Sequence, residues 1–354
     1  MTTIYGKGTP VPPPYAGIVD TVLEVSGDRP IRLLQLTDMQ IIDSSQRRTH
    51  DRLAPSQVEL WRPEAVDVLC FDQIRQLVEE NRPDLIFITG DIIYGEFDDS
   101  GRFMEVFCDF MGSLGVPWAP VYGNHDNESQ MGVDWQNTQF ENAPNSLFCR
   151  GTVSGNGNYS LLITRDGKPS RVLYMMDSGG CGNAYEPEVR RRPGFTPDQM
   201  EWVESTAASL CIVNDGQLVP GFMAFHIPSS EFQQADSELG YTTTDGYCTL
   251  GVNVPVHKGD FGCRWEAHSC FVSPADFPET LHRVGVNGVF VGHCHSINTS
   301  VFWRDIRWTY GLKTGLYDYH TSGQVGGTLI TLTEKRFEVC HAPVSFFFPT
   351  VTRK

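Results

Sequence analysis

Five short blocks of the sequence place carboxylate, amide or imidazole side chains directly after strand-like apolar runs. The blocks are Asp38-Met39-Gln40, Gly90-Asp91-Ile92-Ile93-Tyr94, Gly123-Asn124-His125-Asp126, the single residue His226, and Gly292-His293-Cys294-His295. Because the carboxyl ends of parallel strands meet at one edge of a sheet, side chains far apart in the chain can converge there. Oxygen and imidazole groups are suitable ligands for two adjacent metal ions. The sequence therefore predicts a site for two metals.

The segments before the first three blocks predict a parallel sheet with helical crossovers. Residues 31–37, 85–89 and 117–122 are short apolar runs that are typical of buried strands. Residues 64–80 and 102–114 repeat apolar side chains with the helical period, so each is predicted as a helix with one apolar face. The alternation of strand and helix indicates right-handed parallel crossovers, which bring the three strand ends to one edge.

Local signals also define elements in the second half of the chain. Asp166-Gly167 lies between β-like runs at 159–164 and 171–176 and predicts a hairpin turn. The pattern Thr196-Pro197-Asp198-Gln199 predicts a helix that begins with a capping box and continues to about residue 213. Four later segments are β-like, at residues 300–303, 306–310, 328–333 and 336–341.

The length of 354 residues allows one large domain or two, and no internal repeat or clear linker divides the chain. We therefore expect a single domain over residues 1–354. Residues 1–28 are predicted as an extended lead-in. Residues 228–275 are rich in Gly, Cys, Thr and aromatic residues and are predicted as an insertion on the substrate side.

The composition narrows the class of protein and its partners. A hydrophobic content of 40% and a charged content of 20% are typical of a soluble globular enzyme. The net charge of −16 argues against a nucleic-acid backbone or an anionic membrane as the main partner. A small phosphorylated molecule stays compatible with this charge, because bound cations would invert the local field.

Targeting signals and cysteine usage suggest a compartment. No apolar run approaches the roughly 20 residues that span a bilayer, and the Pro-rich start lacks the apolar core of a signal peptide. The ten cysteines are scattered and form no CxxC pair, so we expect most of them to be reduced thiols. These features favour a cytoplasmic protein.

The order of the five blocks resembles that of the calcineurin-like metallophosphoesterase superfamily, over residues 31 to about 320. The phrases Gly115-Val116-Pro117-Trp118-Ala119, Gly157-Asn158-Tyr159, Leu173-Tyr174-Met175-Met176-Asp177-Ser178-Gly179 and Phe225-His226-Ile227-Pro228 are similar to the single-domain branch related to purple acid phosphatases. The resemblance implies an α/β fold: a four-layer α/β/β/α sandwich with two mixed β-sheets.

The resemblance also implies a ligand set for two ions. The first ion would be bound by Asp38, Asp91, Tyr94 and His295, and the second by Asp91, Asn124, His226 and His293. The first block departs from the superfamily, because Gln40 stands where most members have a histidine ligand. Tyr94 occupies the position of the tyrosine that binds ferric iron in purple acid phosphatases, and a hard phenolate suits a trivalent ion. The amide oxygen of Gln40 is the alternative ligand.

With this ligand set, the resemblance implies Fe(III) in the first site and Fe(II), Mn or Zn in the second. It implies a phosphomonoesterase whose nucleophile is a metal-bridging hydroxide. His125 would act as the general acid and Asp126 would orient it. One alternative is a phosphodiesterase acting on cyclic nucleotides or nucleotide-linked small molecules. A second alternative is a non-catalytic, metal-dependent scaffold.

Several other residues have two interpretations at this stage. Arg47-Arg48 could bind a phosphate or form a solvated charge pair. Trp265 and Tyr241 could stack on an organic leaving group or form a small core of the insertion. His257 and His268 are expected to have no ligand role. The expected partner is a small phosphorylated substrate, with no nucleic acid and no membrane, and the sequence does not identify the substrate-binding residues.

Overall fold

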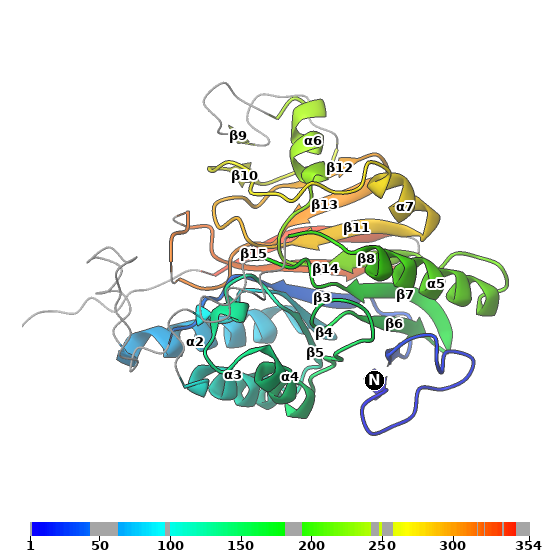
Figure 1. Cartoon of the computed structure of the whole chain (residues 1–354), viewed down its shortest axis with the longest axis horizontal. Coiled ribbons are helices and arrows are strands. Elements are labelled where there is room, and N and C mark those ends of the chain that lie inside the picture. The colour runs from blue at the N-terminus through cyan, green and yellow to red at the C-terminus, as the bar shows by residue number, and fades with distance from the viewer. Residues whose placement is uncertain are drawn as a thin grey trace, which may run out of the picture.

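The computed structural model describes residues 2–42, 63–95, 100–180, 193–241, 248–249, 258–316, 318–321, 323–334 and 336–344. Two mixed β-sheets lie face to face, and helices cover their outer faces (Figure 1). The α/β/β/α sandwich that the resemblance implies is therefore confirmed. The single-domain organisation stays a prediction.

The five-stranded sheet carries the first three sequence blocks at one edge. Its strands, in spatial order, are β15 (Phe337–Pro343), β14 (Gly326–Leu332), β3 (Ile31–Leu36), β4 (Leu85–Thr89) and β5 (Trp118–Val121). Strands β3, β4 and β5 run parallel, and β14 and β15 add antiparallel pairs. All five residues of β4 are buried, as expected for a central strand covered on both faces.

The eight-stranded sheet carries the last two blocks. Its strands, in spatial order, are β1 (Thr2–Tyr5), β2 (Thr21–Val25), β6 (Tyr159–Arg165), β7 (Lys168–Met175), β8 (Gly221–Ala224), β11 (Val286–Val291), β13 (Ile306–Tyr310) and β12 (Ser300–Trp303). Strands β8 and β11 are parallel neighbours, so their carboxyl ends lie together. A separate two-stranded pair joins β9 (Cys248–Thr249) and β10 (Cys263–Arg264).

The amino-terminal stretch differs from the expected extended lead-in over residues 1–28. Strand β1 pairs antiparallel with β2, and β2 pairs parallel with β6, so this stretch forms one edge of the large sheet. The reason is apolar burial, since Leu23 and Val25 are fully buried in the core between the sheets. Strands of four and five residues offer only a short sequence pattern.

The helices form the two outer layers. They are α2 (Pro63–Asn81), α3 (Arg102–Ser113), α4 (Val133–Asn142), α5 (Pro197–Val213), α6 (Ser230–Glu238) and α7 (Phe277–Arg283), with a 3-10 turn η2 (Asp126–Glu128). Helices α2 to α4 lie beside the five-stranded sheet, and α5 to α7 beside the eight-stranded sheet (Figure 1). The predicted capping box is confirmed, because the Thr196 amide donates to Gln199 Oε1 at 2.8 Å.

Aromatic and amide side chains tie the two sheets together. Phe290 of β11 packs edge-on against Phe87 of β4, with ring centroids 5.6 Å apart. Gln35 Nε2 of β3 donates to Thr89 Oγ1 of β4 at 2.9 Å and to the Val291 carbonyl of β11 at 3.0 Å. The second bond links the two sheets directly. These contacts fix the relative position of the strand ends that carry the blocks.

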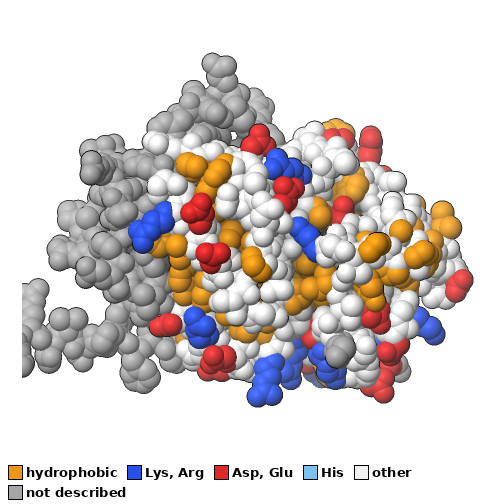
Figure 2. Space-filling model, turned by 90° about the horizontal axis from the view of Figure 1, so that it is seen from below, with side chains coloured by type: hydrophobic (Ala, Val, Ile, Leu, Met, Phe, Trp, Pro, Cys, Tyr) orange, Lys and Arg blue, Asp and Glu red, His pale blue; other side chains and the backbone are white. Residues whose placement is uncertain are grey.

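The surface and the thiols add two further observations. On the face shown in Figure 2, acidic and basic side chains are interspersed with apolar ones, unlike the basic stripe of a nucleic-acid-binding face. None of the helices in the described part of the chain is long and apolar enough to cross a membrane. The cysteine side chains that the structure describes are free thiols. The cytoplasmic location stays a prediction.

Candidate metal centre

Two groups of carboxylate and imidazole side chains meet at one edge of the sandwich. One group is Asp91, His226 and His293, and the other is Asp38, Asp91 and His295. In each group the potential ligand atoms lie within 4.8 Å of one another. Asp91 belongs to both groups, so it is placed to bridge two ions. We call the Asp38/Asp91/His295 group the first subsite and the Asp91/His226/His293 group the second subsite.

The backbone at the strand ends is shaped to turn these side chains together. Asp38, Asp91 and His293 have positive φ angles of 53°, 51° and 73°, a conformation uncommon for residues with a Cβ atom. Two glycines make room for the carboxylates. A Cβ atom on Gly123 would lie 2.1 Å from Asp91 Oδ1, and one on Gly292 would lie 2.6 Å from Asp38 Oδ2.

The second subsite presents three electron-pair donors to one point. His226 Nδ1 lies 2.7 Å from the Thr89 carbonyl, which can only accept, so Nδ1 carries the proton. His226 Nε2 then faces Asp91 Oδ2 at 3.2 Å and Asn124 Oδ1 at 3.1 Å. Three such donors at this distance suit a shared cation. The donor chemistry therefore fits a metal ion.

His293 completes the second group from the other side. Its ring lies edge-on to that of His226, with centroids 5.1 Å apart. His293 Nε2 lies 3.2 Å from the hydroxyl of Ser269, a residue of the expected substrate-side insertion. Residues 228–275, whose role as a substrate-side insertion stays a prediction, thus contact one of the predicted ligands directly.

The first subsite is built around Asp38, which follows β3. Asp38 Oδ2 accepts from Thr37 Oγ1 at 2.7 Å, and both carboxylate oxygens accept from the His293 amide at 3.1 and 3.0 Å. His295 Nε2 lies 3.4 Å from Asp38 Oδ1. On its far side, His295 Nδ1 donates to the Tyr319 carbonyl at 3.0 Å. The carbonyl selects the tautomer that turns an unprotonated Nε2 toward Asp38.

Gln40 and Tyr94, the two alternative ligands, both lie beside this centre. Gln40 Nε2 is 3.4 Å from Asp91 Oδ2, whereas its Oε1 is buried and has no hydrogen-bond partner among the described residues. A buried oxygen without a partner is costly unless it meets a cation or water. The Tyr94 ring stacks on that of His125, with centroids 4.3 Å apart and an angle of 22°. Gln40 Oε1 therefore fits a bound ion, and the ligand role of Tyr94 stays a prediction.

Residues 313–315, which follow β13, contact the backbone on either side of Asp38. The sequence did not predict this contact. Lys313 is only 2% exposed, and its Nζ donates to the Asp38 carbonyl at 2.6 Å. Thr314 pairs with Thr37 through its amide at 2.8 Å and its hydroxyl at 3.1 Å. A Cβ atom on Gly315 would lie 2.0 Å from the Met39 carbonyl. The Lys-Thr-Gly segment thus lies flat against the turn that presents Asp38.

Charge coupling at the centre is strong. Burial by itself would raise the pKa of Asp38, but His295 and His226 outweigh it and lower the pKa to about 2. Burial and the neighbouring His226 lower the pKa of His293 to about 4, whereas Asp91 and Asp38 outweigh burial and raise the pKa of His226 to about 9. The carboxylates thus stay ionised without a metal, and binding ions would displace protons from imidazole.

His125 lies next to the shared carboxylate. Its amide donates to Asp91 Oδ1 at 2.9 Å, and its Nδ1 lies 2.7 Å from Glu128 Oε2. Burial by itself would lower the pKa of His125, but Asp91 and Glu128 outweigh it and raise the pKa to about 9. Nδ1 is occupied by Glu128, so Nε2 is the ring nitrogen available for chemistry.

The predicted partner of His125, Asp126, has a different role, so that part of the prediction is wrong. Asp126 Oδ1 accepts from the amides of Ile92 and Ile93 at 2.9 and 3.0 Å, and Oδ2 from the Gly123 amide at 2.7 Å. Asp126 therefore fixes the loops after β4 and β5. Glu128 contacts His125 in place of Asp126. The reason is turn η2, in which a spacing of three residues places Glu128 next to the His125 ring.

Of the other residues considered from the sequence, two prove structural. Buried His268 bonds Asp236 at 2.9 Å and the Tyr310 hydroxyl at 2.8 Å, and the Tyr241 hydroxyl donates to Asp260 at 2.9 Å. Trp265 is 44% exposed, so a contact with substrate stays open to it. Arg47-Arg48 and His257 lie outside the described residues.

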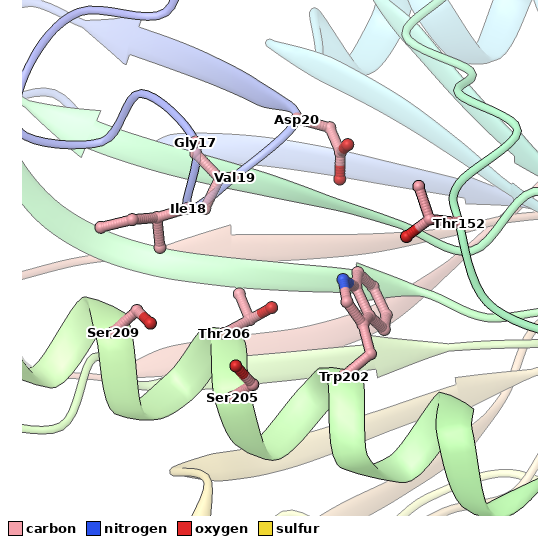
Figure 3. Close-up of a pocket in the computed structure, with 9 residues that line it drawn as sticks. All are labelled: Gly17, Ile18, Val19, Asp20, Thr152, Trp202, Ser205, Thr206 and Ser209. Carbon is pink, nitrogen blue, oxygen red and sulfur yellow. The ribbon is translucent and has the colours of Figure 1, made fainter.

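A cavity of about 320 Å³ lies apart from the candidate metal ligands, between the chain before β2 and helix α5. It is lined by Gly17, Ile18, Val19, Asp20, Thr152, Trp202, Ser205, Thr206 and Ser209. The Trp202 indole nitrogen points toward Asp20 across it (Figure 3). No member of either metal subsite lines this cavity, so it is a separate feature of the surface.

Comparison with known proteins agrees with the geometry. The calcineurin-like phosphoesterase family matches residues 31–296. A probable inactive purple acid phosphatase 29 of Arabidopsis thaliana is 26% identical over 324 residues, which cover 86% of this chain and 76% of that protein. Phosphatase DCR2 of Saccharomyces cerevisiae is 27% identical over 240 residues, covering 63% of this chain and 37% of that protein.

A solved structure shares the fold. The dimetal phosphatase from Danio rerio superposes with a TM-score of 0.51, and the match covers 89% of this chain and 96% of that one. Sequence identity is 13%, so the similarity concerns the architecture alone. All five sequence blocks begin within the range of the family match, whereas Lys313 and Tyr319 lie beyond it.

Proposed function

This chain belongs to the calcineurin-like phosphoesterase family, and from that premise we propose that it is a two-metal hydrolase of small phosphomonoesters. The observation that carries the proposal is the convergence of Asp91 Oδ2 and Asn124 Oδ1 on His226 Nε2, at 3.2 and 3.1 Å, where a bound ion would replace the imidazole proton. Such a cluster, repeated around the same Asp91 by Asp38 and His295, supports a pair of ions.

The residues assigned to each ion follow from the two subsites. The first ion would be held by Asp38, Asp91 and His295 with Tyr94 or Gln40, and the second by Asp91, Asn124, His226 and His293. When bound, the ions would supply Lewis acidity and an acidified water. We propose Fe(III) in the first subsite if Tyr94 is its ligand, and Fe(II), Mn or Zn in the second.

The side chain that handles the leaving group is His125. Glu128 holds Nδ1, which leaves Nε2 to donate a proton to the oxygen that departs from phosphorus. Asp91 fixes the His125 backbone at the same time as it faces both subsites. The proton donor and the ions would therefore share one rigid anchor.

A pair of nitrophenyl substrates tests the proposal. Protein loaded in turn with Fe, Mn and Zn is assayed on a nitrophenyl monoester and a bis-nitrophenyl diester. We expect hydrolysis of the monoester that disappears in the Asp91→Asn variant. Preference for the diester would replace phosphomonoesterase by phosphodiesterase, because the same ligands serve both reactions.

A non-catalytic role is the second candidate, and one specific observation favours it. The Arabidopsis relative is named as probably inactive, although it matches 86% of this chain. The complete donor set supports catalysis instead. Metal-replete wild-type protein that hydrolyses no substrate of a broad phosphoester panel would establish the non-catalytic role.

A further inference from the structure

We propose that Glu266 and Tyr319 form a clasp that positions His295 for the first metal ion. We use "clasp" for these two residues and the hydrogen bond between them. The proposal rests on the proposed function, since it presumes that His295 binds a metal. It assigns a positioning role to residues outside the five sequence blocks.

Tyr319 contacts His295 in two ways. Its carbonyl accepts from His295 Nδ1 at 3.0 Å, and its ring stacks on the imidazole with centroids 4.4 Å apart and an angle of 27°. The first contact sets the tautomer of His295, and the second sets the plane of the ring. Together they direct Nε2 toward Asp38.

Glu266 connects Tyr319 to the chain beside His295. Its Oε2 accepts from the Tyr319 hydroxyl at 2.9 Å, and its Oε1 accepts from the amide of Ser296 at 2.6 Å. The amide of Trp265 donates to the Ser296 carbonyl at 2.8 Å, so Ser296 is held on both sides. One carboxylate thus joins the residue after His295 to the residue stacked on it.

Packing alone does not explain the position of Tyr319. Its side chain is 50% exposed, so little burial restrains the ring, and a tether at the hydroxyl is needed to keep it in place. A competing acceptor is also present, because Asp318 Oδ2 lies 3.6 Å from the same His295 Nδ1. The clasp favours the Tyr319 carbonyl over that carboxylate.

The clasp acts on one subsite because His295 belongs to the first group alone. The histidines of the second subsite have other supports, namely the Thr89 carbonyl for His226 and the Ser269 hydroxyl for His293. Breaking the clasp should therefore weaken the binding of the ion in the first subsite and leave the affinity of the second subsite unchanged. Loss of such an outer partner typically reduces metal affinity about 10- to 100-fold.

Calorimetric titration of the full chain with Mn²⁺ tests this expectation. The His295→Ala and His226→Ala variants define the isotherms of chains that lack the first or the second subsite. For Glu266→Leu and Tyr319→Phe we expect weaker binding in the first subsite, about 10-fold or more for Glu266→Leu. Glu266→Gln should recover most of the affinity, since its amide can bond both partners. Glu334→Leu, at an exposed acidic residue, is the matched control.

The outcomes separate the two proposals. Wild-type affinity in both Glu266→Leu and Tyr319→Phe would overturn the clasp, and so would equal weakening of both subsites. Tyr319→Phe keeps the stacking ring, so it reports on the tether if Glu266→Leu fails to fold. Wild-type protein that binds no Mn²⁺, Fe or Zn would instead overturn the proposed function, and the clasp with it.

Discussion

The two subsites share Asp91 but are supported by different parts of the chain. In the second subsite, His226 is held by the Thr89 carbonyl and His293 by Ser269. In the first subsite, Lys313 donates a hydrogen bond to the Asp38 carbonyl, and the Tyr319 carbonyl accepts one from His295. The supports of the second subsite lie within residues 31–296, and those of the first reach beyond that range.

The supports of the second subsite therefore belong to the part of the chain that matches the family, whereas Lys313 and Tyr319 of the first subsite lie after that part. The strand ends supply ligands to both subsites, and glycines at these ends leave room for the carboxylates. In the described part of the connection from β13 to β14, Lys313 and Tyr319 contact the first subsite. We therefore expect the affinity and identity of the first ion to depend on that connection, and the second ion to be insensitive to it.

The largest effect should come from the residue that the subsites share. Asp91→Asn removes the bridging charge, so we expect loss of both ions and a fall in kcat/KM of about 10⁴-fold or more. Elemental analysis together with the nitrophenyl assay measures both losses. Retention of two ions by this variant would show that the subsites do not depend on a common ligand.

His125 should change the rate without changing either subsite. His125→Ala is expected to slow hydrolysis about 10³-fold, within the usual range for a general acid, and most for alkyl phosphates with poor leaving groups. Metal content should stay at the wild-type value. Glu128→Gln should cost less, because it weakens only the bond that orients the ring. Equal rates on alkyl phosphates for His125→Ala and wild type would remove the proton-donor role.

Lys313 allows a support of the first subsite to be removed without changing a predicted metal ligand. Lys313→Met keeps an aliphatic stem but leaves the Asp38 carbonyl without its donor, so Mn²⁺ affinity in the first subsite should fall about 10-fold. The second subsite should keep its affinity. Lys258→Met removes an exposed lysine and serves as the control. A loss confined to the second subsite would reverse the assignment of supports.

The smallest effect is expected far from the centre, at the ion pair of Arg29 and Asp84. Arg29 donates to Asp84 at 2.8 Å, and although burial opposes it, this pairing helps to hold the pKa of Asp84 below its usual 3.8. Because Arg29 is partly exposed, Arg29→Ala should cost below about 1 kcal/mol at neutral pH.

The sign of the pH dependence follows from the lowered pKa of Asp84. The contribution is present above pH 3.8 and is lost as the pH falls through the lower pKa of the folded state. Wild type and Arg29→Ala should therefore converge in acid. Urea unfolding at several pH values measures this, and altered metal content in Arg29→Ala would show that the pair is not independent of the centre.

Local patterns allowed much of the fold to be predicted. The run at residues 85–89 has the same bounds as β4, and the capping signal at Thr196 begins α5. These features depend on neighbours a few positions away. The parallel topology then predicted that Asp38, Asp91, His226, His293 and His295 would meet, and the structure brings their ligand atoms together.

What the sequence did not predict depends on tertiary contacts. Lys313 reaches Asp38 across 275 positions, and no local pattern encodes that contact. Tyr319 and Glu266 are separated by 53 positions and gain their role only from the position of His295. Glu128 had a readable signal, namely its spacing of three residues from His125 in a turn, but Asp126 was the nearer carboxylate in sequence.

Anomalous diffraction from crystals of Mn²⁺-loaded protein tests the central claim most directly. Two anomalous peaks on either side of Asp91, one beside Asp38 and His295 and the other beside His226 and His293, are the result that we predict. A single peak, or peaks away from Asp91, would contradict a centre in which this carboxylate joins two ions.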